Sequence, residues 1–153
     1  MNKQFEILKK TRKSLLEFTS DLTIDQVNEI PPGYNNNIAW NLGHLVASQQ
    51  VLCYLCAGLP LSIDEKFYER YKSGTKPGAM VDHNELELIK QLALSAIGQF
   101  ESDYQNALFA NYTPWTNRYG IEISTIDDAI AYVIFHEGLH LGFIMALKHL
   151  VKK

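Results

Sequence analysis

Apolar residues recur every three or four positions along most of the chain, which is the spacing that places them on one face of an α-helix. Side chains that can accept a hydrogen bond from the first turn, at Asn36 or Asn37, Asp82 and Thr125, mark where three of these helices start. The pattern predicts four long helices, over about 2–20, 37–57, 82–108 and 125–151.

The connections between these helices differ in length and pattern. The pair Pro31–Pro32 excludes a helix in the first connection, because proline lacks the amide hydrogen and clashes with the preceding turn. Residues 58–82 form a long second connection, in which a capping box at Ser62–Glu65 predicts one short helix. Before the last helix, alternation predicts a short hairpin at Tyr119, Ile121 and Ile123.

Length and composition indicate one soluble domain over residues 1–153. Four amphipathic helices in a chain of this length form an all-α bundle around one core. Apolar residues make up 46% and charged residues 20%, which is an ordinary globular composition. The formal net charge of -3 argues against nucleic acid as a partner, because phosphate contacts need clustered Lys and Arg. The basic cluster "KKTRK" at 9–13 is interpreted as exposed helix positions.

Hydrophobicity and cysteine content indicate the cellular compartment. The start of the chain shows no apolar segment of a signal peptide, and no stretch approaches the roughly 18 apolar residues of a membrane span. The two cysteines fit a reducing compartment better than a disulfide framework. We therefore expect a cytoplasmic protein that does not interact with membranes.

Polar residues interrupt the apolar face of the last predicted helix. The segment "AYVIFHEGLHLGFIMALKHL" holds His136, Glu137 and His140 in a run that otherwise indicates a buried helix. Burying such groups without a partner costs about 1–3 kcal/mol, so they need something to contact. His136 and His140 are four positions apart and share a face with Val133 and Leu147, so both imidazoles are expected to point into the bundle.

The second predicted helix carries one more histidine on its apolar face. His44 lies on a stripe with Trp40 and Val51. A single histidine on such a face is more often a core residue with a satisfied hydrogen bond than a metal ligand. Two histidines on the same face, at His136 and His140, favour metal ligands instead, because neutral partners for two adjacent rings are hard to supply. Three histidines from two helices would form a His₃ metal site, a ligand set that leaves one coordination position open.

The pentapeptide "HEGLH" offers a rival interpretation. It matches H-E-x-x-H, in which two histidines bind zinc and the glutamate is the general base of a metallopeptidase. Many such enzymes take a third ligand well downstream, and only 13 residues follow His140. The predicted fold also has little sheet whose edge could bind a peptide substrate. A peptidase is therefore the less favoured alternative.

Two segments together resemble a known family. "IAWNLGHLVA", followed about ninety residues later by "FHEGLHLGFI", resembles the DinB/YfiT-like metal-binding superfamily, whose members carry W-x-x-x-H-L-like and H-E-x-x-H-x-G-Q-like segments. The resemblance implies a divalent metal ion, with zinc or nickel expected, bound by His44, His136 and His140. Gly142 matches the glycine of the second segment, whereas Phe143 stands where many members have glutamine.

The same resemblance implies a fold and a choice of functions. It predicts a four-helix bundle with up-down-down-up order, in which residues 58–82 cross over between two parallel helices. The superfamily includes metal-dependent hydrolases and thiol-dependent transferases and isomerases. We therefore expect a metal-dependent hydrolase or a thiol-dependent transferase acting on a small molecule. Glu137 lies about 100° around the helix from His136 and is the candidate catalytic base or a partner of the metal site; the alternative for this residue is a helix-surface or interhelical charge. The alternative to an enzyme is a metal-binding, stress-associated protein without turnover. Resembling proteins are often homodimers, which predicts a homodimer here.

Overall fold

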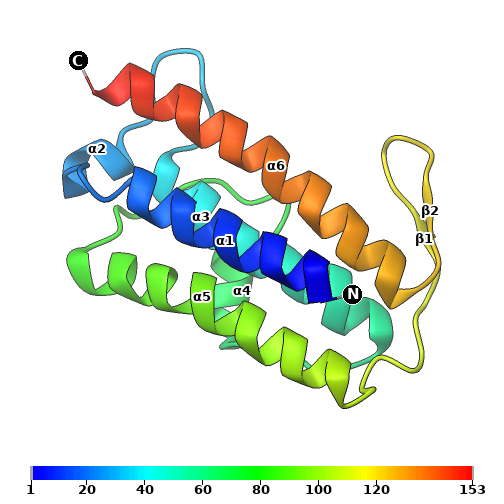
Figure 1. Ribbon diagram of the computed structural model, residues 1–153. Helices are drawn as coiled ribbons and strands as arrows, with labels where there is room; N and C mark the ends of the chain where they lie inside the picture. Colours follow the sequence, from blue (N-terminus) through cyan, green and yellow to red (C-terminus); the bar gives the residue numbers. More distant parts are fainter. Residues whose placement is uncertain (1, 153) are drawn as a thin grey trace.

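Four long helices form the bundle in the computed structural model, which describes residues 2–152. Two of them run in one direction and two in the other, and this confirms the predicted all-α, up-down-down-up architecture (Figure 1). The first and last helices are parallel to each other, and the middle two run opposite to them. In chain order the four are α1 (Asn2–Phe18), α3 (Ile38–Gln49), α5 (His83–Gln105) and α6 (Ile126–Val151).

Short elements complete the fold. Helix α4 (Glu65–Tyr71) lies in the predicted crossover and packs against α3. The predicted hairpin is present as two short antiparallel strands. Helix α2 (Ile24–Asn28) was not predicted. The strands are β1 (Trp115–Thr116) and β2 (Glu122–Ile123).

The helix starts follow the predicted capping residues with one exception. The side chain of Asn37 accepts from the Trp40 amide at the start of α3, and Asp82 and Thr125 cap α5 and α6 in the same way. The predicted capping box at Ser62–Glu65 is wrong, because Asp64 caps α4. The Ser62 amide and hydroxyl instead donate to Oε1 of buried Gln50 and tie this connection to the end of α3.

Helix α3 is the most enclosed helix of the bundle and carries one of the three histidines. All of its residues are buried, because α5, α6 and α4 pack around it. Its continuation changes to a π-helical turn over Gln50–Tyr54 and then to a 3₁₀ turn over Leu55–Ala57. Single π-helical turns are frequent at functional sites. Here the turn directly follows the segment that holds His44.

Helix α6 is long and apolar enough to cross a membrane by length and composition alone. In the bundle one side of it packs against α1 and α3. Its opposite side, called here the outer face of α6, exposes Phe135, Leu139 and Met145. Phe135 packs edge to face on Tyr119 of the hairpin, whereas Leu139 and Met145 are about half exposed. An exposed apolar helix face is a candidate contact surface.

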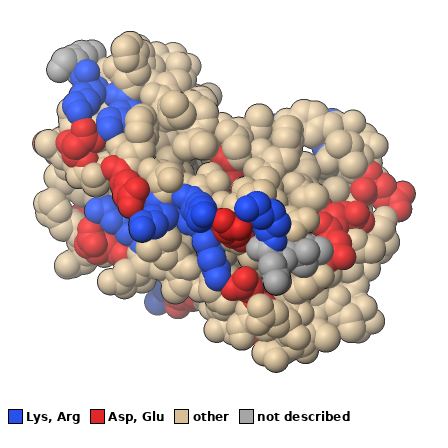
Figure 2. Space-filling model, viewed as in Figure 1, with Lys and Arg blue, Asp and Glu red and all other residues tan. Residues whose placement is uncertain are grey.

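Charged side chains of both signs are interspersed on the face shown in Figure 2. On α1, Lys3 and Lys10 both pair with Glu6 within the helix. The basic cluster at 9–13 is accordingly exposed at its lysines, as predicted. Its arginine is the exception: Arg12 is only 1% exposed.

Candidate metal centre

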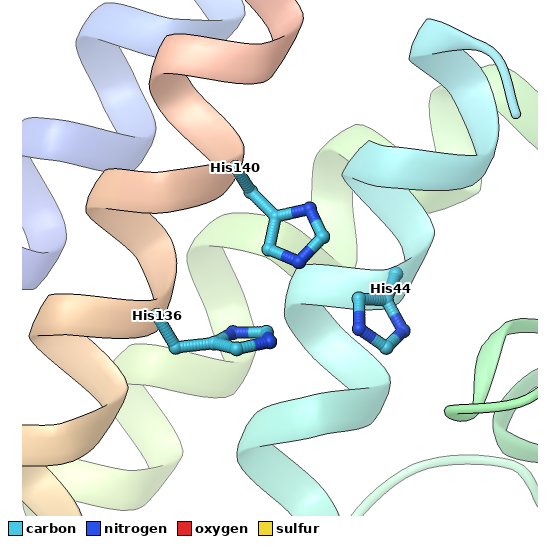
Figure 3. A group of neighbouring side chains, drawn as sticks. All are labelled: His44, His136 and His140. Carbon is cyan, nitrogen blue, oxygen red and sulfur yellow. The ribbon is translucent and has the colours of Figure 1, made fainter. Parts of the chain in front are cut away.

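Three imidazole rings converge between α3 and α6. His44 extends from α3, and His136 and His140 extend from successive turns of α6 (Figure 3). Their candidate ligand atoms all lie within 4.8 Å of one another. The ring centroids of His136 and His140 are 4.5 Å apart. The centroid of His44 lies 5.4 Å from that of His136 and 4.9 Å from that of His140. The structure thus brings together the three histidines singled out in the sequence.

His44 is held in one orientation by its neighbours. Its Nδ1 lies 2.8 Å from the carbonyl oxygen of Tyr71, and its Nε2 lies 3.0 Å from Oγ of Ser48. Because a carbonyl can only accept, Nδ1 carries the proton and Nε2 holds the lone pair. The indole of Trp40 stacks on the ring at 4.5 Å with an interplanar angle of 12°. The nitrogen that can bind an ion is therefore Nε2.

His140 is oriented by a chain of amides at the start of α3. Its Nδ1 lies 2.8 Å from Oδ1 of Asn41. The Nδ2 group of Asn41 donates to the Asn37 carbonyl and to Oδ1 of Asn36, so its Oδ1 faces the ring as an acceptor. His140 therefore donates through Nδ1 and leaves Nε2 available. Metal-binding histidines commonly donate their second nitrogen in this way, which fixes the tautomer and the ring.

All three rings are held in the neutral form. Burial, with His44 and Arg118 as additional causes, lowers the pKa of His136 to about 4. Burial lowers the pKa of His140 to about 3, with His136 and His44 as additional causes. Burial also lowers the pKa of His44. Neutral imidazole is the form that binds metal ions, so no proton has to leave these rings at neutral pH.

The cluster fits a divalent ion. Three neutral nitrogen donors from two helices meet in one place, and two of them have partners that fix the lone pair on Nε2. Zinc–nitrogen bonds of about 2.0–2.1 Å would require the rings to draw together by roughly one ångström. The His136 ring makes no hydrogen bond to any other residue in the described part of the chain, so it is free to make this adjustment. Imidazole ligands suit zinc and nickel alike.

The histidines line one wall of a pocket of about 360 Å³. Aromatic rings from three elements form much of the remaining wall, and one cation lies at its edge. None of the aspartates or glutamates in residues 2–152 lines this pocket, so Arg118 is its one formally charged side chain there. These wall residues are Trp40, Trp115, Arg118 and Tyr132.

Glu137 has a different neighbour from the one expected. Its Oε1 accepts from Nε of Arg12 at 2.9 Å and from a terminal nitrogen of the same guanidinium at 2.6 Å. Both side chains are almost fully buried, at 2% and 1% exposure. Arg12 also donates to the carbonyl oxygens of Leu45 and Ala93, so it links α1 to the other three long helices.

The sequence-based placement of the α6 faces needs correction. The histidines were expected on the buried stripe, with Glu137 about 100° away at the edge of the ion. In the structure Glu137 itself lies on the buried stripe with Val133 and Ile144. His136 and His140 lie at the border of that stripe and face the pocket. The reason is that Oε1 of the carboxylate pairs with Arg12 inside the bundle, where Oε2 is buried without a hydrogen-bond partner among the described residues, so Glu137 is not a wall residue of the pocket.

Several residues of the site were missed in the sequence. The Tyr71 carbonyl had no sequence signal, because any residue supplies a carbonyl. Asn41 and Ser48 could have been noticed, since each lies one turn from His44. Trp115 and Arg118 lie in the hairpin, whose position over α6 is a tertiary feature.

The family's usual glutamine position does not contribute to this pocket. Phe143 is half-buried and packs on the ring of Tyr34, with the centroids 5.6 Å apart.

Of the two tyrosines in α4, Tyr71 is in the core and Tyr68 packs against the core. Neither side chain is a wall residue of the described pocket.

Comparisons with known proteins agree with this fold. The sequence model of the DinB superfamily matches residues 7–144. Among solved structures, a conserved protein from Enterococcus faecalis superposes with a TM-score of 0.67 at 12% identity, over 98% of this chain and 95% of that one. At this identity the likeness shows the fold alone. No curated protein matches the sequence.

Proposed function

The chain belongs to the DinB superfamily, and we propose that it is a metal-dependent, thiol-using transferase that acts on a small molecule. The observation that carries this proposal is the set of three neutral imidazoles in a pocket that no described carboxylate lines. His44, His136 and His140 are the proposed ligands of a divalent ion, zinc or nickel. The finer assignment, transferase rather than hydrolase, rests on the position of Glu137.

Charge is the first part of the argument. A divalent ion held by three neutral ligands supplies uncompensated positive charge, which favours the thiolate form of a bound thiol or polarises a substrate oxygen. Arg118 adds positive charge at the pocket edge. Glu137 does not offset this charge, because Arg12 already pairs with it. The pocket therefore favours an anionic ligand such as a thiolate.

The polar side chains around His44 then have defined roles. The Ser48 hydroxyl lies beside Nε2 of His44 and donates to it. When Nε2 is occupied, that hydroxyl proton is free to be donated to an anion in the pocket. The rings of Trp40, Trp115 and Tyr132 form an apolar wall beside it.

Hydrolysis by a carboxylate base fits this geometry less well. A general base has to lie within hydrogen-bond reach of the proton that it takes. Glu137 is not a wall residue of the pocket, and its Oε1 atom is bound by Arg12 inside the bundle. We therefore propose that Glu137 stabilises the bundle. The same argument counts against a peptidase of the H-E-x-x-H type.

Turnover assays distinguish the candidate functions. The metal-loaded protein should transfer a low-molecular-weight thiol to an electrophilic substrate, and His140→Ala should abolish this turnover. Ester hydrolysis without any thiol would instead support the hydrolase. Metal binding without turnover on either panel would support a non-catalytic, stress-associated metal-binding protein.

Assembly and location belong to the same proposal. We propose a cytoplasmic homodimer that forms through the outer face of α6, where Phe135, Leu139 and Met145 are exposed. The formal net charge of -3 supports the proposal that nucleic acid is not a partner.

A further inference from the structure

Arg118 lies in a turn whose backbone is fixed by hydrogen bonds. The side chain of Asn117 accepts from the amides of Tyr119 and Ile121, at 2.9 and 3.0 Å. The Gly120 amide donates to the Asn117 carbonyl, and Gly120 has a φ of 78°, a conformation that glycine adopts without strain. The turn therefore holds the Cα of Arg118 in a defined place above α6.

Arg118 differs from the other two arginines of the chain. Arg12 pairs with Glu137, and Arg70 pairs with Glu85 at 2.8 Å. Within residues 2–152, Arg118 makes neither a hydrogen bond nor an ion pair with another residue. It is nevertheless a wall residue of the pocket that holds the three histidines. Its side chain is exposed to solvent at the pocket, and its donors are unused within residues 2–152.

The surroundings of Arg118 suit a flat apolar group. Trp115 and Tyr132 are wall residues of the same pocket, and their rings meet edge to face with centroids 5.6 Å apart. The indole nitrogen of Trp115 donates to the hydroxyl of Tyr112, so this ring is held in place. An apolar body can pack on these rings with an anionic group directed to Arg118. A volume of about 360 Å³ suits a small molecule.

We propose that Arg118 binds the carboxylate of a small molecule whose apolar body lies against Trp115 and Tyr132 and extends toward the three histidines. A guanidinium presents two parallel N–H donors, which match the two oxygens of a carboxylate. Arg118 is thus a specificity-determining residue. The inference rests on the proposed function in that it assigns the substrate class of the same pocket.

The test uses metal-free protein, so that the carboxylate preference does not depend on an ion. Calorimetric titrations at low salt would compare 1-naphthoate with its neutral counterpart, 1-naphthamide. Wild-type protein should bind the carboxylate about five- to tenfold more tightly, as expected for a partly exposed charge-assisted pair. Arg118→Met should remove this preference without changing the affinity for the amide, and Arg118→Lys should keep part of it.

A matched control removes a positive charge elsewhere. Lys13, on α1, has an exposed side chain and is not a wall residue of the pocket. Lys13→Met should keep the wild-type preference, because only the net charge changes. Equal affinities of wild-type protein for both probes, or an equal loss of both in Arg118→Met, would overturn the proposal.

The binding test of Arg118 and the turnover test of the proposed function can fail independently of each other. A protein that binds no divalent ion but still prefers naphthoate through Arg118 would contradict the metal-dependent enzyme alone. A protein that binds metal and turns over a thiol, but has no preference between the two probes, would contradict the role of Arg118 alone.

Discussion

Arg12 and Glu137 are 125 positions apart in the sequence and form an ion pair between α1 and α6, with both side chains almost completely buried. The glutamate of the H-E-x-x-H segment thus connects α6 to α1. The two histidines of that segment face the pocket on the neighbouring side of α6. One pentapeptide therefore serves both the core and the candidate metal centre.

Removing either partner of this pair should destabilise the fold strongly. Glu137→Ala would leave a buried guanidinium without its carboxylate, and breaking such a pair costs about 3–5 kcal/mol. The double variant Arg12→Met, Glu137→Leu should recover most of this loss, because neither charge remains. Urea denaturation of the three proteins measures the free energy of unfolding. Glu137→Ala with wild-type stability would contradict the structural role.

The catalytic role of Glu137 has its own test. Glu137→Gln keeps the shape of the side chain, and if it folds, metal affinity should stay within about tenfold of wild type. Turnover per folded, metal-loaded molecule should also be nearly unchanged. A fall of about 10²–10⁴ in turnover, the usual effect of losing a general base, would restore the hydrolytic mechanism.

Gly43 should not tolerate a side chain. A Cβ atom added there would lie 2.5 Å from Cδ1 of Tyr71, and the carbonyl of Tyr71 orients His44. Overpacking of this kind costs about 1–3 kcal/mol. Gly43→Ala should therefore lower both the melting temperature and the affinity for the ion.

A second glycine provides the control for this substitution. Gly98, on α5, has no atom within 4 Å of an added Cβ. Gly98→Ala should stabilise the protein by about 0.5–1 kcal/mol, the gain expected in an open helix position. Equal effects of the two substitutions on stability and metal affinity would show that neither property depends on the close approach of Tyr71 to Gly43.

The buried rings should make the stability of the metal-free protein pH-dependent. The pKa values of His136 and His140 are lowered to about 4 and about 3, from an ordinary value of 6.5. Between pH 6.5 and 4 the unfolded chain therefore binds more protons than the folded one. The free energy of unfolding should be highest above pH 6.5 and should fall as the pH is lowered.

A variant isolates this contribution from that of the carboxyl groups. The double variant His136→Gln, His140→Gln should lose much less stability between pH 7 and pH 5 than the wild type. Chemical denaturation at the two pH values measures the difference. Parallel losses in the two proteins would show that these rings are not the groups responsible.

Assembly can be tested on the outer face of α6. Wild-type protein should be a dimer by light scattering at micromolar concentration, and Leu139→Lys should shift it to a monomer. Leu94, on α5, is exposed to a similar extent, at 46% against 48% for Leu139, so Leu94→Lys is the control and should remain dimeric. A wild-type monomer, or dissociation by Leu94→Lys, would contradict the predicted interface.

Much of the bundle could be predicted from the sequence, because local rules determine it. Helical periodicity and the capping residues located the four long helices within a few positions, except that α3 ends at Gln49 and continues to Ala57 as a π-helical and a 3₁₀ turn. Helix α2 was missed, since a helix of five residues is too short to show a period, although its capping box of Thr23 and Gln26 was a usable signal.

The environment of Glu137 depended on a residue far away in the sequence. Arg12 was grouped with the basic cluster around it and interpreted as exposed. It nevertheless continues the spacing of Phe5, Leu8 and Leu15, which are all buried on α1. Each of two helices therefore carries a charged residue on its apolar stripe, and the two charges have opposite sign. Whether such residues form a pair depends on how the helices pack, which the sequence alone does not show. The same holds for Arg118, because no period relates the hairpin to α6.

The most direct test of the account is the metal content of the protein and of its five histidine variants, purified without a nickel column and measured by elemental mass spectrometry. Wild-type protein should bind one divalent ion per chain. Alanine at His44, His136 or His140 should reduce this to background, since losing a ligand costs more than the roughly 10–100-fold that an orienting partner contributes. Alanine at His83 or His149 should leave it unchanged. Full metal content in His140→Ala, or equal losses in all five variants, would contradict a centre built from these three rings.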